Sequence, residues 1–148
     1  MAGQSGRLGK SVTERTAPSY PSRDLGPLPV DLVNAALGTE LEPGRVRLST
    51  LAHKHMAEDH PDDYATCIAT LPLAVADPTF IGQAPRKTGN FEMLRRVNRP
   101  DGKVVLVAIG LERDDRGDYR VRSCYLVSAE TVDSRRRAGR LIAPPPRP

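Results

Sequence analysis

Apolar side chains recur at helical spacing through the first half of the chain. Residues 30–37 (VDLVNAAL) predict a short helix that Gly38 stops. Ser49 or Thr50 can cap a second helix that runs to Asp59. In a third segment four apolar side chains share one helix face at i, i+3, i+4 and i+7, namely Tyr64, Cys67, Ile68 and Leu71. This segment is the clearest amphipathic helix of the chain.

From Phe80 onward the apolar pattern becomes typical of strands. Three β-like runs cover residues 91–97, 103–111 and 119–127, and turn sequences at 101–102 and 114–118 separate them. Such short loops make neighbouring strands antiparallel. A short extended piece is expected at 45–48 and a final short helix after Ser128. The order predicts an α+β domain with N-terminal helices packed on one face of a small antiparallel β-sheet, whose other face is free to form a site.

The two ends of the chain lack this patterning. Residues 1–27 contain almost no large apolar side chain that could offset about 1–2 kcal/mol of backbone entropy per ordered residue. We therefore expect a disordered tail or linker over 1–27, a domain over 28–143, and a loose Pro-rich end at 144–148. No apolar run approaches the length of about 18 residues that a membrane span needs, and residues 1–20 are polar and lack the apolar segment of about 7–15 residues typical of a secretory signal. These features predict no membrane association, no Sec export and a cytoplasmic site of action.

Charge is distributed unevenly along a chain of net charge +4. Residues 85–148 carry fifteen Lys or Arg against eight Asp or Glu, whereas residues 28–84 carry three against eight. A one-sided positive field attracts phosphate backbones, although an Arg-rich codon bias would also produce it, since 18 of the 22 basic residues are Arg. The two cysteines, Cys67 and Cys124, lack metal-binding or redox spacing, and we expect both to be free and buried.

All three histidines lie within eight positions, at His53, His55 and His60. Helical geometry places His55 only 40° from Leu51, so we expect His55 to border the buried side of its helix. Two close imidazoles can serve as the base and acid of phosphodiester cleavage. The alternatives are surface histidines on a polar helix, or a zinc site, although no His-Glu-x-x-His pattern is present. The chain also lacks the glycine motifs of nucleotide sites, and no cofactor is expected.

The strand at 119–127 carries the other candidate site residues. Alternation puts Ser123 and Tyr125 on one face, where a hydroxyl can hold a base edge and a ring can stack on it. The alternative is a half-buried tyrosine in a core that is poor in aromatic residues. Four arginines follow in the last helix and form either a solvated face or a track for a phosphate backbone: Arg135, Arg136, Arg137 and Arg140.

Residues 46–85 resemble the opening of the phage-associated barnase, EndoU, colicin and RelE-like (PBECR) nuclease domains. His55, His60 and Pro61 match a His-x-x-x-x-His-Pro motif, and residues 77–82 match an Asp-Pro-x-aromatic-Ile-Gly turn before an antiparallel sheet. The segment 123–125 is similar to the Ser/Thr-x-Tyr strand motif of EndoU-type enzymes, which use two histidines and a lysine. Lys87 lies between these motifs, and the resemblance spans about residues 44–143.

The resemblance implies a metal-independent endoribonuclease in which the 2′-hydroxyl attacks the adjacent phosphate and leaves a 2′,3′-cyclic phosphate. His55 and His60 would be the acid/base pair and Lys87 the electrostatic stabiliser, with His60 as acid and His55 as base or the reverse. A toxin or phage effector would need an acidic immunity protein or antitoxin as partner. The alternative is a non-catalytic nucleic-acid-binding or virion-binding module. The expected RNA contacts are Ser123 and Tyr125 to the base, and Arg96, Arg120 and Arg122 to phosphate.

Overall fold

The computed structural model of the chain describes residues 19–85 and 88–145. Within them the helices are α2 (Val30–Leu37), α3 (Thr50–Asp59), α4 (Tyr64–Ala76) and α5 (Ala129–Arg137). The strands are β2 (Arg23–Pro27), β3 (Arg45–Leu48), β4 (Phe80–Gln83), β5 (Asn90–Arg96), β6 (Val104–Gly110), β7 (Tyr119–Val127) and β8 (Leu141–Ile142).

The strands form one seven-stranded sheet in the order β2-β3-β7-β6-β5-β4-β8. Every neighbouring pair is antiparallel except β3 and β7, which run parallel. The meander β5-β6-β7 forms its centre, as the short turns between these strands predict. The α+β class, with helices placed before an antiparallel meander, is confirmed.

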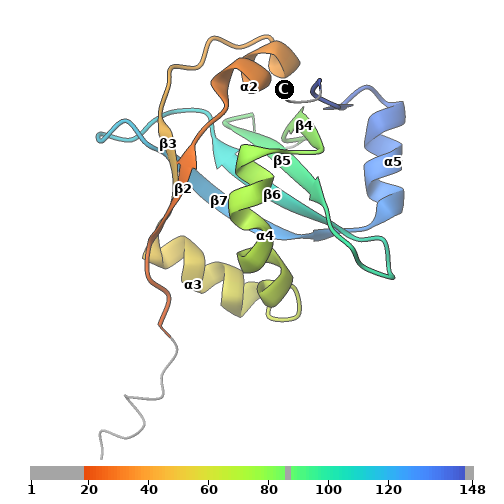
Figure 1. Cartoon of the computed structure of the whole chain (residues 1–148), viewed down its shortest axis with the longest axis horizontal. Helices are drawn as coiled ribbons and strands as arrows, with labels where there is room; N and C mark the ends of the chain where they lie inside the picture. The colour runs from red at the N-terminus through yellow and green to blue at the C-terminus, as the bar shows by residue number, and fades with distance from the viewer. Residues whose placement is uncertain (1–18, 86–87, 146–148) are drawn as a thin grey trace, which may run out of the picture.

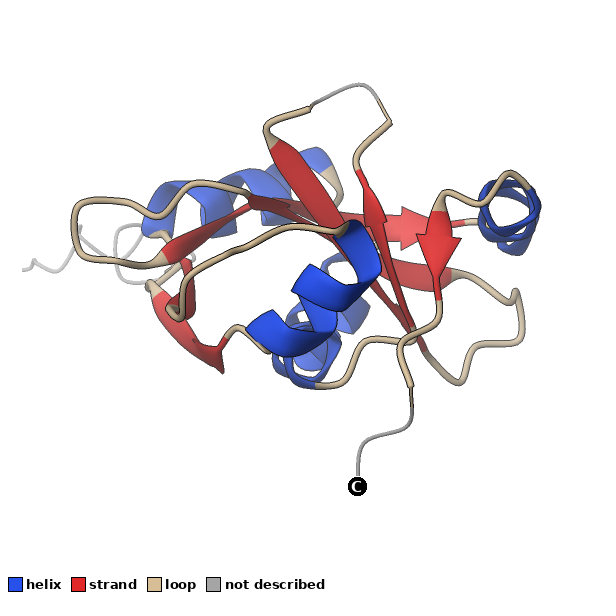
Figure 2. Ribbon diagram, turned by 90° about the horizontal axis from the view of Figure 1, so that it is seen from above, coloured by secondary structure: helices blue, strands red, loops and turns tan. Residues whose placement is uncertain are grey.

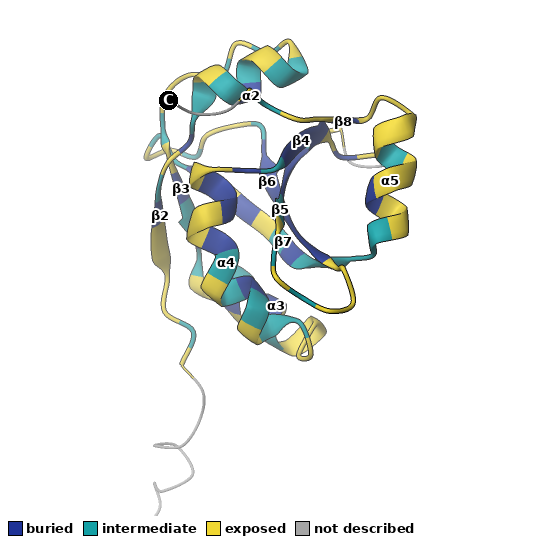
Figure 3. Cartoon of the chain, turned by 45° about the vertical axis from the view of Figure 1, so that its right-hand side comes forward, coloured by how far each residue is buried: buried dark blue, intermediate teal, exposed yellow. Residues whose placement is uncertain are grey.

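The two faces of the sheet are covered differently. Helices α2, α3 and α4 contribute Val33, Met56 and Leu71 to a large hydrophobic core that includes Val107 and other residues from one sheet face. Helix α5 lies apart from these helices (Figures 1 and 3) and buries Val132 in a smaller cluster. The smaller cluster occupies only one end of the second face, built from Phe80, Leu94, Val104, Leu106, Ala108 and Leu141. Among the described helices, α5 alone packs on this second face (Figure 2).

A bulge in β7 sets which side chains reach each face. Ile109 pairs with Val121, but Ala108 pairs with Ser123, so Arg122 has no partner of its own on β6. An extra residue in one strand reverses the faces of the residues that follow. Val121 therefore enters the core beneath the helices, whereas Ser123 lies on the opposite face. This break explains why simple alternation along β7 mixes polar and apolar residues on each side.

Local capping fixes three helix ends where the sequence predicts them. The Ser49 hydroxyl oxygen accepts a hydrogen bond from the Ala52 N–H at 3.1 Å, and Ser128 accepts one from Thr131 at the same distance. Helix α2 ends at Gly38, whose φ of 69° lies in the left-handed region that glycine tolerates best.

The expected N-terminal tail was wrong for residues 23–27. These residues form β2, which pairs antiparallel with β3 and buries Leu25. The segment is also fastened just before the strand, because the His53 ring contacts the Pro21 carbonyl oxygen at 2.9 Å. Tyr20 packs edge-on against that ring. Residues 1–18 of the predicted tail, and 146–148 of the Pro-rich end, lie outside the described residues.

The orientation expected for α3 was also wrong. Its buried side chains are His53 and Met56, whereas His55 is exposed and Leu51 is 63% exposed. His53 is 1% exposed and uses both ring nitrogens. A carbonyl oxygen only accepts, so Nδ1 donates to Pro21, and Nε2 forms a hydrogen bond with the Tyr64 hydroxyl at 2.7 Å. These partners replace water and allow a polar side chain to face the core.

The sequence pattern did not predict the two short strands β4 and β8. The turn expected at residues 77–82 contains β4, which pairs with β5, and β8 extends the sheet by two residues. Cys67 and Cys124 are both buried and free, as expected. None of the described helices has the length and apolar character that a membrane crossing requires.

Replacing His53 by Ala should lower the free energy of unfolding by about 2–4 kcal/mol. The change removes two hydrogen bonds to part-buried partners, each worth about 0.5–1.5 kcal/mol, and it leaves a cavity where the buried ring packs. Urea denaturation followed by circular dichroism measures the loss. The matched control is His55→Ala on the exposed side of the same helix, which should change the unfolding free energy by no more than about 0.5 kcal/mol. Equal effects of the two variants would contradict a fastening role for His53.

Candidate functional site

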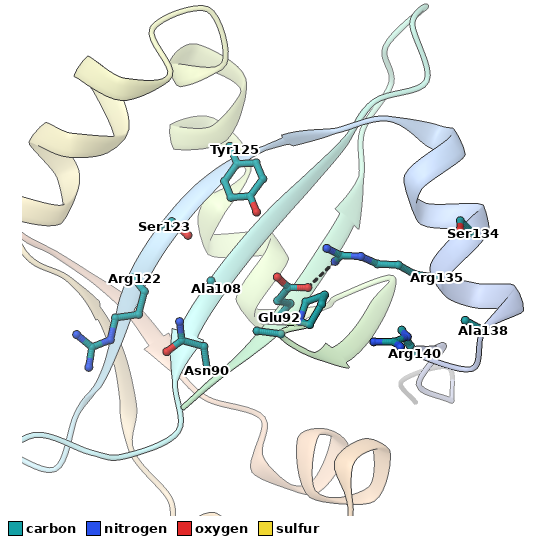
Figure 4. Close-up of a pocket in the computed structure, with 12 residues that line it drawn as sticks. Asn90, Glu92, Ala108, Arg122, Ser123, Tyr125, Ser134, Arg135, Ala138 and Arg140 are labelled. Carbon is teal, nitrogen blue, oxygen red and sulfur yellow. Dashed lines mark hydrogen bonds and ion pairs between the residues drawn. The ribbon is translucent and has the colours of Figure 1, made fainter. Parts of the chain in front are cut away.

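A pocket of about 680 Å³ opens between the second sheet face and α5. Its floor arises from the central strand, where the side chains on this face shrink from Leu106 to Ala108 to Gly110. Its volume lies in the range of small-molecule and substrate sites. Figure 4 shows the residues that line it: Ala84, Pro85, Asn90, Glu92, Ala108, Arg122, Ser123, Tyr125, Ser134, Arg135, Ala138 and Arg140.

Strand register places the polar side chains around this floor. Ala108 lies between Glu92 on β5 and Ser123 on β7, because it pairs with both. One row further along β6, Gly110 pairs with Asn90. The small central residues therefore leave the polar groups of the flanking strands exposed to one shared space.

An ion pair between Glu92 and Arg135 lies at the bottom of the pocket (Figure 4). Arg135 of α5 donates through Nη1 to Oε1 of Glu92 at 2.6 Å. Glu92 is only 4% exposed, and burial raises its pKa above the ordinary glutamate value although the Arg135 charge acts in the opposite direction. A carboxylate with a raised pKa in a pocket is a candidate proton acceptor.

Tyr125 lies beside this pair and directs its hydroxyl towards it (Figure 4). Burial, together with the negative charge of Glu92, raises the pKa of the Tyr125 hydroxyl. The group therefore stays a neutral hydrogen-bond donor at physiological pH. The ring also stacks on His60, with centroids 5.2 Å apart and planes inclined by 24°. The structure thus brings two of the predicted site residues into contact.

The pocket carries an excess of positive charge. Glu92 neutralises Arg135, but Arg122 and Arg140 also line the walls and form no ion pair with any residue of the described chain. Two uncompensated guanidinium groups around a concave surface favour an anionic ligand, and guanidinium geometry matches phosphate oxygens well.

The other predicted site residues lie elsewhere. His55 is exposed on α3 and is absent from the pocket lining. Arg96 packs over the Phe80 ring, with its guanidinium carbon 5.1 Å from the ring centroid, and Arg120 bonds Asp114 at 3.0 Å. Lys87 lies outside the described residues. The structure therefore unites Ser123, Tyr125 and Arg122 in the pocket and places His60 against Tyr125.

Sequence reasoning missed Asn90 and Glu92, and it assigned Arg135 and Arg140 to a solvated helix face or a phosphate track without placing them in a pocket. One signal was present in β6 (VVLVAIG), where one alternating set is uniformly large and the other shrinks towards Gly110. The second signal was Glu92 itself, a single charge within the apolar run FEML. A charged residue in such a run is almost never fully buried unless it is paired.

No cluster of three or more His, Cys, Asp or Glu side chains suited to a metal ion occurs among residues 19–85 and 88–145. No protein-family model matches the chain, and neither a curated protein nor a solved structure does. The functional assignment therefore depends on the chemistry of the pocket.

The raised pKa of Glu92 predicts a pH-dependent contribution to stability. The native state holds the Glu92 proton more tightly than the unfolded chain does, so this contribution is fully present below the ordinary glutamate pKa of about 4.3 and is lost as pH rises through the raised value. The unfolding free energy of the wild type minus that of Glu92→Gln should therefore fall between about pH 4 and pH 7. Urea unfolding at several pH values measures the difference. The exposed Glu112→Gln serves as the control and should show no such trend. A difference that grows with pH would mean that Arg135 dominates over burial.

Proposed function

We propose that the chain is a metal-independent endoribonuclease whose reaction takes place in this pocket. The observation that carries the proposal is the buried Glu92–Arg135 pair, with a tyrosine hydroxyl and two uncompensated arginines around it. Such a site offers a proton acceptor and cations for a phosphodiester without help from a cofactor. The resemblance of residues 46–85 to PBECR nuclease domains and the α+β architecture agree with this assignment.

The proposed reaction begins when Glu92 accepts the proton of the ribose 2′-hydroxyl. The 2′-oxygen then attacks the adjacent phosphorus, and the bond from phosphorus to the 5′-oxygen of the next nucleotide breaks, which yields a 2′,3′-cyclic phosphate. A proton delivered to that 5′-oxygen completes the step, and His60 beside Tyr125 is the proposed donor. Atoms and charge therefore balance without a metal or a redox partner.

Arg135 links the carboxylate to the phosphate in this proposal. Only its Nη1 is engaged with Glu92, and a guanidinium has five N–H donors. The remaining donors can hold a phosphate oxygen while Glu92 stays in place, which brings the neighbouring 2′-hydroxyl close to the base. Arg140 and the Tyr125 hydroxyl would stabilise the charge that develops on the phosphate.

The proposal revises the predicted acid/base pair. His55 and His60 are both exposed and outside the pocket lining. His60 keeps a role because its ring stacks on Tyr125, and Glu92 takes the part of the base. Lys87 stays a prediction. The biological setting also stays as proposed from the resemblance, namely a toxin or phage effector whose positively charged pocket an acidic immunity protein or antitoxin would cover.

One observation favours a second candidate function, a non-catalytic RNA-binding module. The only carboxylate lining the described pocket is already bonded to Arg135. A pocket whose base is neutralised in this way can hold a phosphate without reacting with it. The two functions differ in what Glu92 does, because a binding module keeps its RNA intact whether residue 92 is Glu or Gln.

The purified protein should cleave RNA in the presence of EDTA and leave 2′,3′-cyclic phosphate ends. Glu92→Gln should reduce the cleavage rate by about 10²–10⁴-fold, the usual contribution of a general base, while the exposed Glu112→Gln keeps the wild-type rate. Gel analysis of end-labelled RNA, followed by phosphatase treatment of the products, measures both effects.

Three results would count against the proposal. Intact RNA with wild-type protein would favour the binding module, and products with 3′-hydroxyl and 5′-phosphate ends would indicate two-metal hydrolysis. A Glu92→Gln variant that cleaves at the wild-type rate would remove Glu92 from the reaction and return the role of base to His55.

The cleavage rate should fall on the acidic side of the pH profile. Glu92 must be ionised to accept a proton, and burial raises its pKa, so this fall should lie above the ordinary glutamate value of about 4.3. Single-turnover rates between pH 4 and pH 9 measure it. His60→Ala should lower the maximal rate, because it removes the proposed proton donor. An unchanged acidic limb in Glu92→Gln would contradict the assignment.

A further inference from the structure

One end of the pocket has no part in the reaction proposed above. The lining residues at this end are Asn90 on β5, one row beyond Glu92, and Arg122 on β7, next to Ser123. Asn90 pairs with Gly110 of β6, which lies beneath Arg122. Figure 4 shows Asn90 and Arg122 at this end, on the opposite side of Glu92 from the Tyr125 ring. Its position next to the reacting groups suits a subsite that holds part of the same ligand.

Gly110 leaves room for the Arg122 side chain to lie over the sheet at this end. A Cβ at position 110 would lie only 3.1 Å from Nε and 3.3 Å from Nη2 of Arg122. The guanidinium therefore occupies the space above the glycine backbone, to which the bulge in β7 directs it. Asn90 approaches the same glycine from the other flank, because the two residues are paired.

The two polar side chains at this end have unused hydrogen-bonding groups. Neither the Arg122 guanidinium nor the Asn90 amide forms a hydrogen bond or ion pair with another described residue, whereas the nearby Arg120 and Arg135 are both bonded to carboxylates. Arg122 offers donors alone, in a planar fork, and Asn90 offers a donor and an acceptor. The matching ligand edge presents two neighbouring acceptors to the fork.

We propose that Asn90, Gly110 and Arg122 form a subsite that selects guanine in a single-stranded RNA. Guanine places two acceptors, O6 and N7, side by side, which is the pattern that arginine binds in a bidentate manner. Adenine has a donor, N6, where guanine has O6, and uracil has no two adjacent acceptors. Cytosine presents O2 and N3 side by side on its other edge and is the competing base that the C probe tests. The inference rests on the proposed function only in taking RNA as the ligand.

The experiment measures binding separately from cleavage. Fluorescein-labelled 2′-O-methyl tetranucleotides of G, A, C or U serve as probes in fluorescence anisotropy, because a methylated 2′-oxygen cannot attack the phosphate. We expect the G probe to bind about tenfold more tightly than the A probe, which corresponds to about 1.4 kcal/mol and falls in the usual range for one bidentate contact. A second probe pair of mixed sequence, which differs only by a single G or A at one position, should rank in the same order. Such probes avoid the stacking between strands that runs of G cause.

Variants of Arg122 test the origin of the preference. Arg122→Ala should abolish the preference, and Arg122→Lys should keep most of the affinity while it also loses the preference, because lysine lacks the fork. The charge-matched control is Arg116→Ala, in the exposed β6–β7 loop outside the pocket, which should keep both. Arg122 is exposed, so these variants should fold, and circular dichroism checks that they do.

Equal binding of all four probes, a preference for adenine, or a guanine preference that survives in Arg122→Ala would each overturn the subsite. No binding of any probe would overturn it as well. Guanine-selective binding by a protein that leaves unmodified RNA intact would instead refute the proposed cleavage and keep the subsite. The two proposals therefore fail separately.

Discussion

The pairing of β6 with β7 governs both faces of the sheet. A single extra residue, Arg122, lies between the Val121–Ile109 pair and the Ser123–Ala108 pair. Before it, the inward side chains of β7 complete the core beneath the helices, and after it Ser123 and Tyr125 belong to the pocket. Without this shift, the residues of one segment would be on the wrong face, since a slip of one position exchanges the two sides of a strand.

Local signals in the sequence determined most of the fold. The bounds of α2, and the start and end of α3, follow from caps and stops within a few residues, and the meander follows from two short turns. Strands β2 and β8 depend instead on partners that are distant in the chain. The face that α3 buries could not be predicted locally either. His53 can be buried only because Tyr64 and Pro21, which are distant in the sequence, form hydrogen bonds with its two ring nitrogens.

The candidate site likewise combines residues that local sequence patterns reveal with residues that only the fold brings together. Ser123 and Tyr125 lie two apart on one strand, so alternation alone could associate them. Glu92 and Arg135 are 43 positions apart and meet only because α5 folds back over the second face. That helix is fastened through Val132 and through Phe80, whose ring lies beneath the guanidinium groups of Arg96 and Arg136. Two arginines of the basic last helix thus have defined structural partners that no linear charge pattern can reveal.

The small residues at the floor of the pocket bring stability and activity into opposition. Ala108 and Gly110 are buried positions in the centre of the sheet, where larger apolar side chains would gain about 25 cal/mol for each Å² removed from water. Directed evolution for heat resistance alone would thus tend to fill the floor at Ala108, and the more robust variants would be the ones with the least room for a ligand. The taper from Leu106 to Gly110 is therefore a place where selection for robustness and selection for function would drive the sequence in opposite directions.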